Sequence, residues 1–127
     1  MERITRKMDW FKPEEFDCKC GCGLGIGDMD IELLGILDAI RWKLGKPIFI
    51  NSAIRCPLHN EKVGGTVESS HMYGFAVDIR ALEYGYRFEL LSVIMKHTGI
   101  NRIGVYSTFI HIDIDCSKRE RVIWIGE

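Results

Sequence analysis

The clearest helical pattern of the chain lies between residues 28 and 44. Apolar side chains recur there every three or four positions and share one helix face: Met29, Leu33, Ile36, Leu37, Ile40 and Leu44. An aspartate at position 28 or 30 can cap the start, and Gly45 followed by Pro47 ends the pattern. We therefore predict one amphipathic helix over this range.

A second helix is predicted over residues 86–97, with Phe88, Leu91, Ile94 and Met95 facing inward. Runs rich in isoleucine, valine and phenylalanine predict strands at 48–51, 75–80, 102–106, 109–115 and 121–125. Together these elements predict an α+β fold in which a small antiparallel sheet packs against two helices.

Two segments lack either periodicity. Residues 8–27 form a Cys/Gly-rich segment in which four glycines argue against regular structure. Residues 51–74 are a long connection rich in serine, asparagine, glycine and histidine. Because loops longer than about 12–15 residues inside compact domains are usually functional, we expect this connection to carry part of a site.

Length and composition predict that residues 1–127 form one soluble globular domain. The chain is 46% hydrophobic and 28% charged, close to globular averages. A net charge of −1 gives no electrostatic footprint for nucleic acid, and no apolar run approaches the roughly 18 residues that membrane insertion needs. No apolar stretch follows the basic start, so we expect no signal peptide and a cytoplasmic location. We also expect a monomer.

The predicted strand at 109–115 alternates isoleucine with ionisable residues. Because successive strand side chains point to opposite faces, the isoleucines face the core and the other face presents His111, Asp113 and Asp115. A solvent-facing edge strand with ordinary polar residues is the alternative interpretation of this run alone.

A second ionisable pair runs from the long connection into the next strand. His71 lies seven residues before Asp78, across Gly74, which permits a sharp turn. Catalytic zinc sites use three protein ligands plus water, and imidazole nitrogen and carboxylate oxygen both bind zinc. His71 and Asp78, closed by His111 from a neighbouring strand, satisfy that count and are candidate ligands for a Zn²⁺ cofactor, although neither H-E-x-x-H nor paired C-x-x-C spacing is present.

The five cysteines include a cluster at Cys18, Cys20 and Cys22. Without an export signal, reduced thiols in a turn are the expected state. Pairing of one thiol with Cys56 or Cys116 in an oxidising medium is a second interpretation. A structural metal is a third, although C-x-C-x-C differs from the C-x-x-C knuckle of common zinc ribbons.

Several short motifs follow one another in a fixed order. They are Ser52-Ala53-Ile54-Arg55-Cys56-Pro57-Leu58-His59-Asn60, Val63-Gly64-Gly65, Ser70-His71-Met72-Tyr73-Gly74-Phe75-Ala76-Val77-Asp78-Ile79, Ile103-Gly104-Val105-Tyr106 and Phe109-Ile110-His111-Ile112-Asp113. Over about residues 10–115 this set closely resembles the M15 zinc peptidases, the D-alanyl-D-alanine carboxypeptidase and phage endolysin family with the hedgehog-type fold. The run Phe16-Asp17-Cys18-Lys19-Cys20-Gly21-Cys22 resembles the start of its small single-domain branch.

The resemblance implies roles for individual residues. It assigns His71, Asp78 and His111 as zinc ligands. Arg55 is expected to contact substrate and polarise the scissile carbonyl or a carboxylate, and Ser70 and Tyr106 are expected to bind substrate.

One position departs from the family pattern. Several branches place the catalytic acid three residues before the third ligand, where this chain has Thr108. The nearest candidate base is Asp113, with Asp115 as second choice. This carboxylate would take a proton from the attacking water and pass it to the leaving amine.

These observations predict a zinc metallopeptidase that hydrolyses peptidoglycan stem peptides or cross-links, as a carboxypeptidase or endopeptidase. A phage endolysin, cytoplasmic until released to the cell wall at lysis, fits the expected lack of an export signal. A non-catalytic, zinc-stabilised binding module of the same fold is the alternative, favoured by Thr108. An interaction module built around the cysteine cluster is a third hypothesis.

Overall fold

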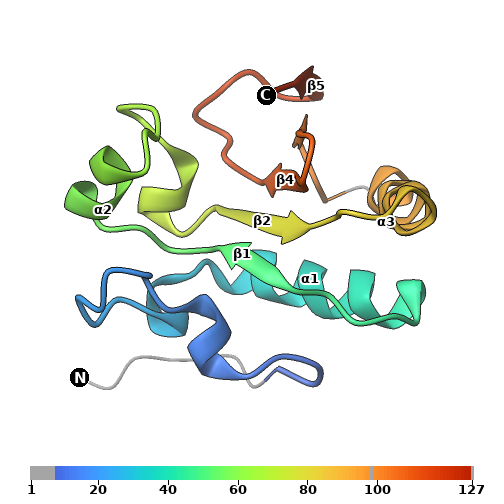
Figure 1. Cartoon of the computed structure of the whole chain (residues 1–127), viewed down its shortest axis with the longest axis horizontal. Coiled ribbons are helices and arrows are strands. Elements are labelled where there is room, and N and C mark those ends of the chain that lie inside the picture. Colours follow the sequence, from blue (N-terminus) through green and yellow to red (C-terminus); the bar gives the residue numbers. More distant parts are fainter. Residues whose placement is uncertain (1–7, 98, 127) are drawn as a thin grey trace.

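A computed structural model of the chain describes residues 8–97 and 99–126 (Figure 1). The helices are α1 (Ile31–Leu44), α2 (Pro57–Lys62) and α3 (Tyr84–Lys96), with short 3-10 turns η1 (Pro13–Phe16), η2 (Ile26–Asp28) and η3 (Ser70–Tyr73). The strands are β1 (Ile50–Ser52), β2 (Ala76–Arg80), β3 (Arg102–Val105), β4 (Phe109–Asp113) and β5 (Val122–Ile125). The predicted α+β class is confirmed.

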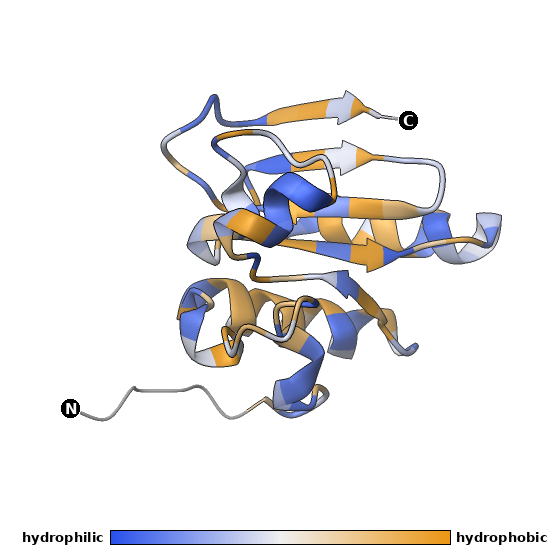
Figure 2. Ribbon diagram, turned by 60° about the vertical axis from the view of Figure 1, so that its left-hand side comes forward, coloured by the Kyte–Doolittle hydropathy of each residue, from blue (hydrophilic) through white to orange (hydrophobic). Residues whose placement is uncertain are grey.

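The five strands form one sheet in the order β1-β2-β4-β3-β5. Its pairs are antiparallel except β3 and β5, which run parallel, so the prediction of an antiparallel sheet is wrong at this edge. The reason is the order of the strands. Both β3 and β5 run antiparallel to β4, and β5 pairs with the free edge of β3 instead of with β4, so β3 and β5 are parallel. Figure 2 shows β5 at the edge of the sheet far from the N-terminal segment.

Helix α1 has the predicted amphipathic character and defined ends. The Asp30 carboxylate accepts hydrogen bonds from the backbone N–H groups of Glu32 and Leu33, which caps the first turn. Gly45 ends the helix in the left-handed conformation at φ 68°, where glycine has no steric penalty. The apolar face between these ends is therefore fixed toward the sheet.

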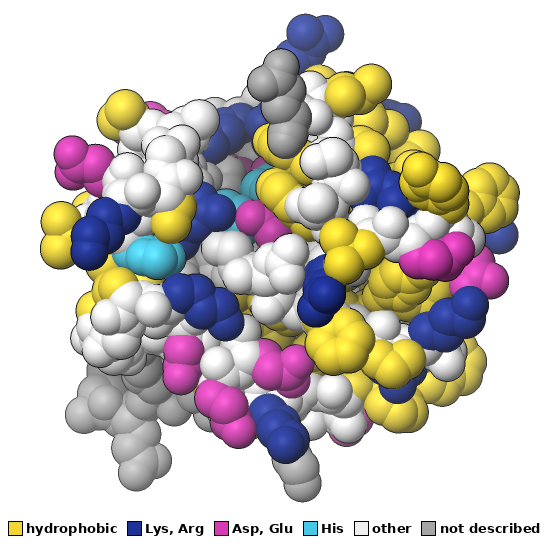
Figure 3. All heavy atoms as spheres, viewed as in Figure 1, with side chains coloured by type: hydrophobic (Ala, Val, Ile, Leu, Met, Phe, Trp, Pro, Cys, Tyr) yellow, Lys and Arg dark blue, Asp and Glu magenta, His cyan; other side chains and the backbone are white. Residues whose placement is uncertain are grey.

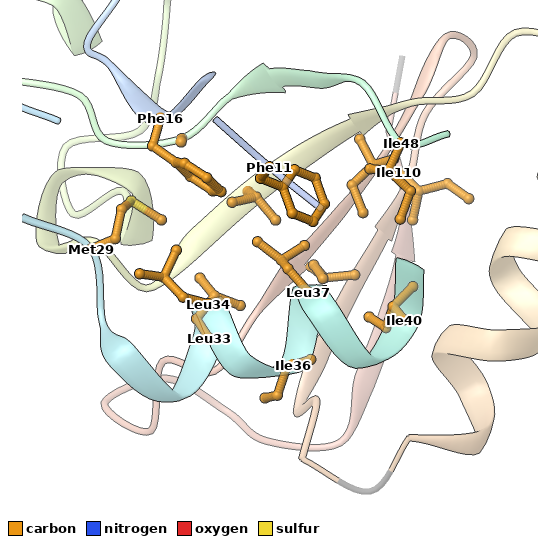
Figure 4. Packing of buried hydrophobic residues seen from close by; sticks show 14 of the residues in the cluster. Phe11, Phe16, Met29, Leu33, Leu34, Ile36, Leu37, Ile40, Ile48 and Ile110 are labelled. Carbon is orange, nitrogen blue, oxygen red and sulfur yellow. The ribbon is translucent and has the colours of Figure 1, made fainter. Parts of the chain in front are cut away.

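The core lies between α1 and one face of the sheet (Figure 4). Leu33, Leu37 and Ile40 of α1 are fully buried together with the isoleucines of β2 and β4. Phe11 and Phe16 from the N-terminal segment close the other side of this cluster. Because the isoleucines occupy the core face, the alternate residues of β2 and β4 lie on the opposite face.

Helix α3 differs from the prediction in its first residue and in the side chains that it buries. It begins at Tyr84, because the Glu83 carboxylate caps the N–H groups of Gly85 and Tyr86. Its buried stripe is Leu90 and Ile94, four residues apart, whereas Phe88 and Met95 are exposed. The prediction that these last two face inward is wrong, because the buried face of the helix is centred on Leu90 and Ile94.

The long connection contains more regular structure than expected. Helix α2 begins after Cys56, with Pro57 in the first helical turn where its missing N–H is not needed. Asn60 is buried and donates from its side-chain amide to the carbonyl of Thr66 at 2.8 Å. None of the helices in the described ranges combines the length and apolar character that crossing a membrane requires.

Candidate metal centre

His71, Asp78 and His111 meet on the face of the sheet opposite α1. Asp78 of β2 stands directly across from His111 of β4 in the antiparallel register. His71 comes from η3, just before β2. Asp78 Oδ1 lies 3.1 Å from His71 Nε2 and 2.9 Å from His111 Nδ1, and the three potential ligand atoms lie within 4.8 Å of one another.

The turn that seats His71 depends on Gly74. This residue ends η3 in the left-handed conformation at φ 75°. A Cβ atom at this position would lie 2.2 Å from the carbonyl oxygen of Asp28, so only glycine fits. The carbonyl of Gly74 also accepts the N–H of Asp30 at 3.0 Å. These contacts anchor η3 against the start of α1.

The outer nitrogen of each histidine has a hydrogen-bond acceptor. His71 Nδ1 lies 2.8 Å from the carbonyl oxygen of Ala53, and His111 Nε2 lies 2.7 Å from Asp113 Oδ2. Because a carbonyl and an ionised carboxylate can only accept, both outer nitrogens carry the hydrogen in the neutral rings. The inner nitrogens then direct lone pairs at the Asp78 carboxylate.

Two lone pairs facing one carboxylate oxygen require a positive charge between them. Either a metal cation or protonation of the rings supplies it. In the metal-free protein burial favours the neutral carboxyl, but hydrogen bonds from His111 and His71 outweigh burial and hold the pKa of Asp78 below its usual range. Likewise, burial disfavours charge on His111, but hydrogen bonds to Asp113 and Asp78 raise its pKa above the usual range of histidine. The donor set therefore fits a divalent cation.

Arg55 holds the second oxygen of the Asp78 carboxylate. Its Nη2 donates to Asp78 Oδ2 at 3.3 Å, Nε donates to Ser52 Oγ at 3.0 Å, and Nη1 donates to Asn60 Oδ1 at 3.2 Å. The guanidinium side chain is only 14% exposed. These three bonds fix the planar group beside the three converging ligands, with a positive charge at the wall of the pocket.

A pocket of about 430 Å³ opens over this centre. Three cationic side chains line it, Arg55, Arg102 and Lys118, together with the aromatic residues Tyr106 and Trp124. Figure 3 shows histidine atoms in cyan beside acidic and basic side chains on this face of the molecule. Each of the three cations lies within ion-pair distance of a carboxylate: Arg55 of Asp78, Arg102 of Asp113 and Lys118 of Asp115.

Three of these pocket residues escaped the sequence analysis. Trp124 reaches the pocket because β5 pairs with β3, and its indole ring lies over Gly104 with its centroid 5.3 Å from that of His111. Trp124 Nε1 donates to the Tyr106 hydroxyl at 2.9 Å, which leaves the Tyr106 proton free to donate elsewhere. Arg102 and Lys118 carry no local motif that could have identified them. For Trp124 the glycine at position 104 is a local signal, because a Cβ atom there would collide with the indole ring.

Asp113 lies behind the His111 ring rather than beside the converging ligands. Its Oδ2 accepts from His111 Nε2 at 2.7 Å and from Arg102 Nε at 3.3 Å, and its Oδ1 accepts the N–H of Asp115 at 3.1 Å. The side chain is 1% exposed. Both carboxylate oxygens are thus committed to protein donors.

Ser70 and Asp115 form a separate buried pair. Ser70 Oγ donates to Asp115 Oδ2 at 2.7 Å and accepts from Lys118 Nζ at 3.0 Å. Strand β4 ends at Asp113, so Asp115 does not continue the predicted alternating face, and it is not among the residues lining the pocket. This pair anchors the chain that carries Lys118 beneath η3.

Comparison with known proteins gives one finding that agrees with this geometry. The family model described as Peptidase M15 matches residues 9–114, which is most of the chain and includes His71, Asp78, His111 and Arg55. A search of curated proteins gives no match. From the extent of the family match, the chain belongs to the M15 peptidase family.

Proposed function

We propose that this chain is a zinc-dependent peptidase that hydrolyses peptide bonds in the stem peptides or cross-links of bacterial peptidoglycan. One observation carries the proposal: two imidazole nitrogens and a carboxylate oxygen come together among the residues that line a pocket. Family membership supports peptide hydrolysis as the reaction class.

His71, Asp78 and His111 are the residues that would hold the metal. Two nitrogens and one oxygen are a donor set that suits zinc, and three protein ligands leave a position open for water or substrate. Bound zinc supplies Lewis acidity, which polarises a carbonyl group and activates water near neutral pH. No cysteine takes part in this reaction.

Arg55 and Tyr106 are placed to act on the substrate. The fixed guanidinium of Arg55 stabilises the negative charge that develops on the scissile carbonyl oxygen, or binds a substrate carboxylate. Tyr106 accepts from Trp124 and so directs its own hydroxyl proton toward a substrate acceptor. Ser70 has its hydroxyl engaged with Asp115 and Lys118, so its role is to support the pocket wall.

The cationic side chains of the pocket support this substrate class. Arg55, Arg102 and Lys118 surround the centre, and stem peptides carry free carboxylates at D-residues and at the chain end. Charge-assisted hydrogen bonds to carboxylates are stronger than neutral ones and orient the peptide. Release to the cell wall as a phage endolysin stays a prediction from the sequence resemblance.

Asp113 orients His111 in this proposal, in place of the general-base role predicted from the sequence. A metal-binding histidine commonly donates its other N–H to a carboxylate, which fixes the tautomer and the ring. Asp113 has this relation to His111 Nε2, and Arg102 and the backbone N–H of Asp115 also donate to its carboxylate oxygens. Asp113 is therefore a positioning residue.

The test is a digest of purified peptidoglycan by the zinc-loaded protein, with and without chelator, read by mass spectrometry. We expect new stem-peptide fragments that disappear with chelator and with His71→Ala, and their masses will identify the bond. The control is Cys116→Ser, which changes an exposed thiol away from the pocket. Intact muropeptides from a zinc-loaded protein would overturn the proposal and favour the non-catalytic binding module.

A further inference from the structure

Four cysteine thiols gather at a second place, between the N-terminal segment and the loop that carries Arg55. Cys18, Cys20 and Cys22 come from the segment, and Cys56 follows Arg55 directly. The Sγ atom of Cys20 lies 3.5 Å from those of Cys18 and Cys56, and all four sulfurs lie within 4.8 Å of one another. The fifth cysteine, Cys116, is not part of this cluster.

The sulfur spacing matches a shared metal ion. Tetrahedral zinc with four thiolates at about 2.3 Å places the sulfurs about 3.8 Å apart. A disulfide would bring two sulfurs to about 2.05 Å, and all five cysteines are free thiols in the structure. The observed separations of 3.5 Å lie close to the edge of such a tetrahedron.

The backbone of the segment is shaped to turn its sulfurs inward. Gly21 and Gly23 adopt left-handed conformations at φ 79° and 99°, and nothing lies within 4 Å of a Cβ atom at either position. Glycine is thus needed there for conformation rather than space. The N–H of Gly21 donates to the carbonyl of Cys18, and the N–H of Cys18 donates to the carbonyl of Leu24, which closes the loop.

Backbone donors also point at the sulfurs. The N–H of Cys56 lies 3.4 Å from Cys18 Sγ, and the N–H of His59 lies 3.4 Å from Cys56 Sγ. Hydrogen bonds of this kind stabilise thiolates and orient them as ligands. Cys18 is buried and Cys56 is half-buried, whereas Cys20 and Cys22 are exposed, so a metal has a direct path to the cluster.

From this geometry we propose that Cys18, Cys20, Cys22 and Cys56 bind a structural zinc ion, separate from the site at His71, Asp78 and His111. Binding displaces the thiol protons and ties the N-terminal segment to the loop at residues 53–56. That loop positions the candidate active site, because the carbonyl of Ala53 accepts from His71 Nδ1 and the N–H of Arg55 donates to the carbonyl of His71. The second zinc thus supports the pocket from outside.

The test counts metal in protein purified with zinc and a phosphine reductant. We expect two zinc ions per chain in the wild type and in the control Cys116→Ser. We expect one in the double variant Cys20→Ser/Cys22→Ser and one in His71→Ala/His111→Ala. Cobalt substitution should give thiolate-to-cobalt charge-transfer absorption in the wild type and the histidine variant, and none in the cysteine variant.

The experiment tests the two proposed zinc sites independently. Loss of the only zinc in the histidine variant, with unchanged zinc in the cysteine variant, would overturn the cysteine site and leave the proposed peptidase intact. A disulfide among these four cysteines that persists in the intact mass of protein purified with the phosphine reductant, together with a single zinc, would also overturn it. Because Cys20 and Cys22 are exposed, serine at these positions should preserve the fold, which circular dichroism checks.

Discussion

His111 makes a different contact through each nitrogen of its ring, and this asymmetry organises the centre. Nε2 faces the buried carboxylate of Asp113, and Nδ1 faces Asp78. The alternation of residues 110–113 in the sequence already predicted that His111 and Asp113 share a face. It could not predict that the carboxylate sits behind the ring, because that depends on the partners supplied by Arg102 and the backbone of Asp115.

Substitution of Asp113 distinguishes an orienting role from a base. If Asp113 orients His111, Asp113→Asn should weaken zinc binding about 10- to 100-fold, measured by competition with a chromophoric chelator. The matched control is Asp9→Asn at an exposed position, which should leave the affinity unchanged. Unchanged zinc affinity in Asp113→Asn, with turnover lost, would restore the base role.

Even a conservative replacement of Arg55 by lysine should reduce the rate of peptide hydrolysis. Lysine cannot reproduce the three bonds that the guanidinium makes to Ser52, Asn60 and Asp78. We expect Arg55→Lys to keep its zinc and lose about 10²- to 10³-fold in kcat, measured on released stem fragments. The exposed Arg80→Lys is the control, and equal turnover in the two variants would remove Arg55 from the mechanism.

Acid should weaken metal binding through His111. Its pKa is raised above the usual range of histidine in the metal-free protein, because hydrogen bonds to Asp113 and Asp78 outweigh the opposing effect of burial. Below that raised pKa a proton occupies the nitrogen that the metal needs, so zinc affinity should fall as the pH falls. Competition titrations on both sides of neutrality measure this dependence, and an affinity that stays constant on acidification would contradict it.

At the scale of elements, the placement of the ligands depends on one register and one turn. The pairing of β2 with β4 sets Asp78 opposite His111, and Gly74 turns η3 so that His71 reaches both. The sequence predicted these strands and the turn from alternation and from glycine. It did not predict the parallel pairing of β5 with β3, because β5 does not pair with β4, the strand before it in the chain, and no local signal marks this.

The turn at Gly74 can be tested against a glycine of the same conformation. Gly74 and Gly64 both have φ 75°, but a Cβ atom at 74 would meet a backbone oxygen at 2.2 Å and one at 64 would meet nothing within 4 Å. Gly64→Ala should cost about 1–2 kcal/mol of unfolding free energy from the left-handed conformation alone. Gly74→Ala should cost more, as measured by urea denaturation. Equal losses would contradict the close contact.

At the scale of the whole molecule, the two faces of the sheet have different roles. Its isoleucine face packs on α1 and forms the core, and its other face carries the candidate centre beneath a cationic pocket. The core face was accessible from the sequence because it follows from local periodicity. Strand alternation together with the resemblance to M15 peptidases predicted that His71, Asp78 and His111 form one site, and the structure brings these three side chains together. The pocket walls at Arg102, Lys118 and Trp124 were not predicted. No local pattern marks Arg102 of β3, and Lys118 and Trp124 reach the pocket only through tertiary contacts.

The most direct test of the proposed centre is a crystal structure of zinc-loaded protein with anomalous diffraction measured at the zinc absorption edge. We predict a peak bound by His71 Nε2, Asp78 and His111 Nδ1 at about 2.0–2.2 Å, with Asp113 still bonded to His111 Nε2. Absence of a peak among these three residues, or coordination through His111 Nε2 with the ring turned over, would contradict the account.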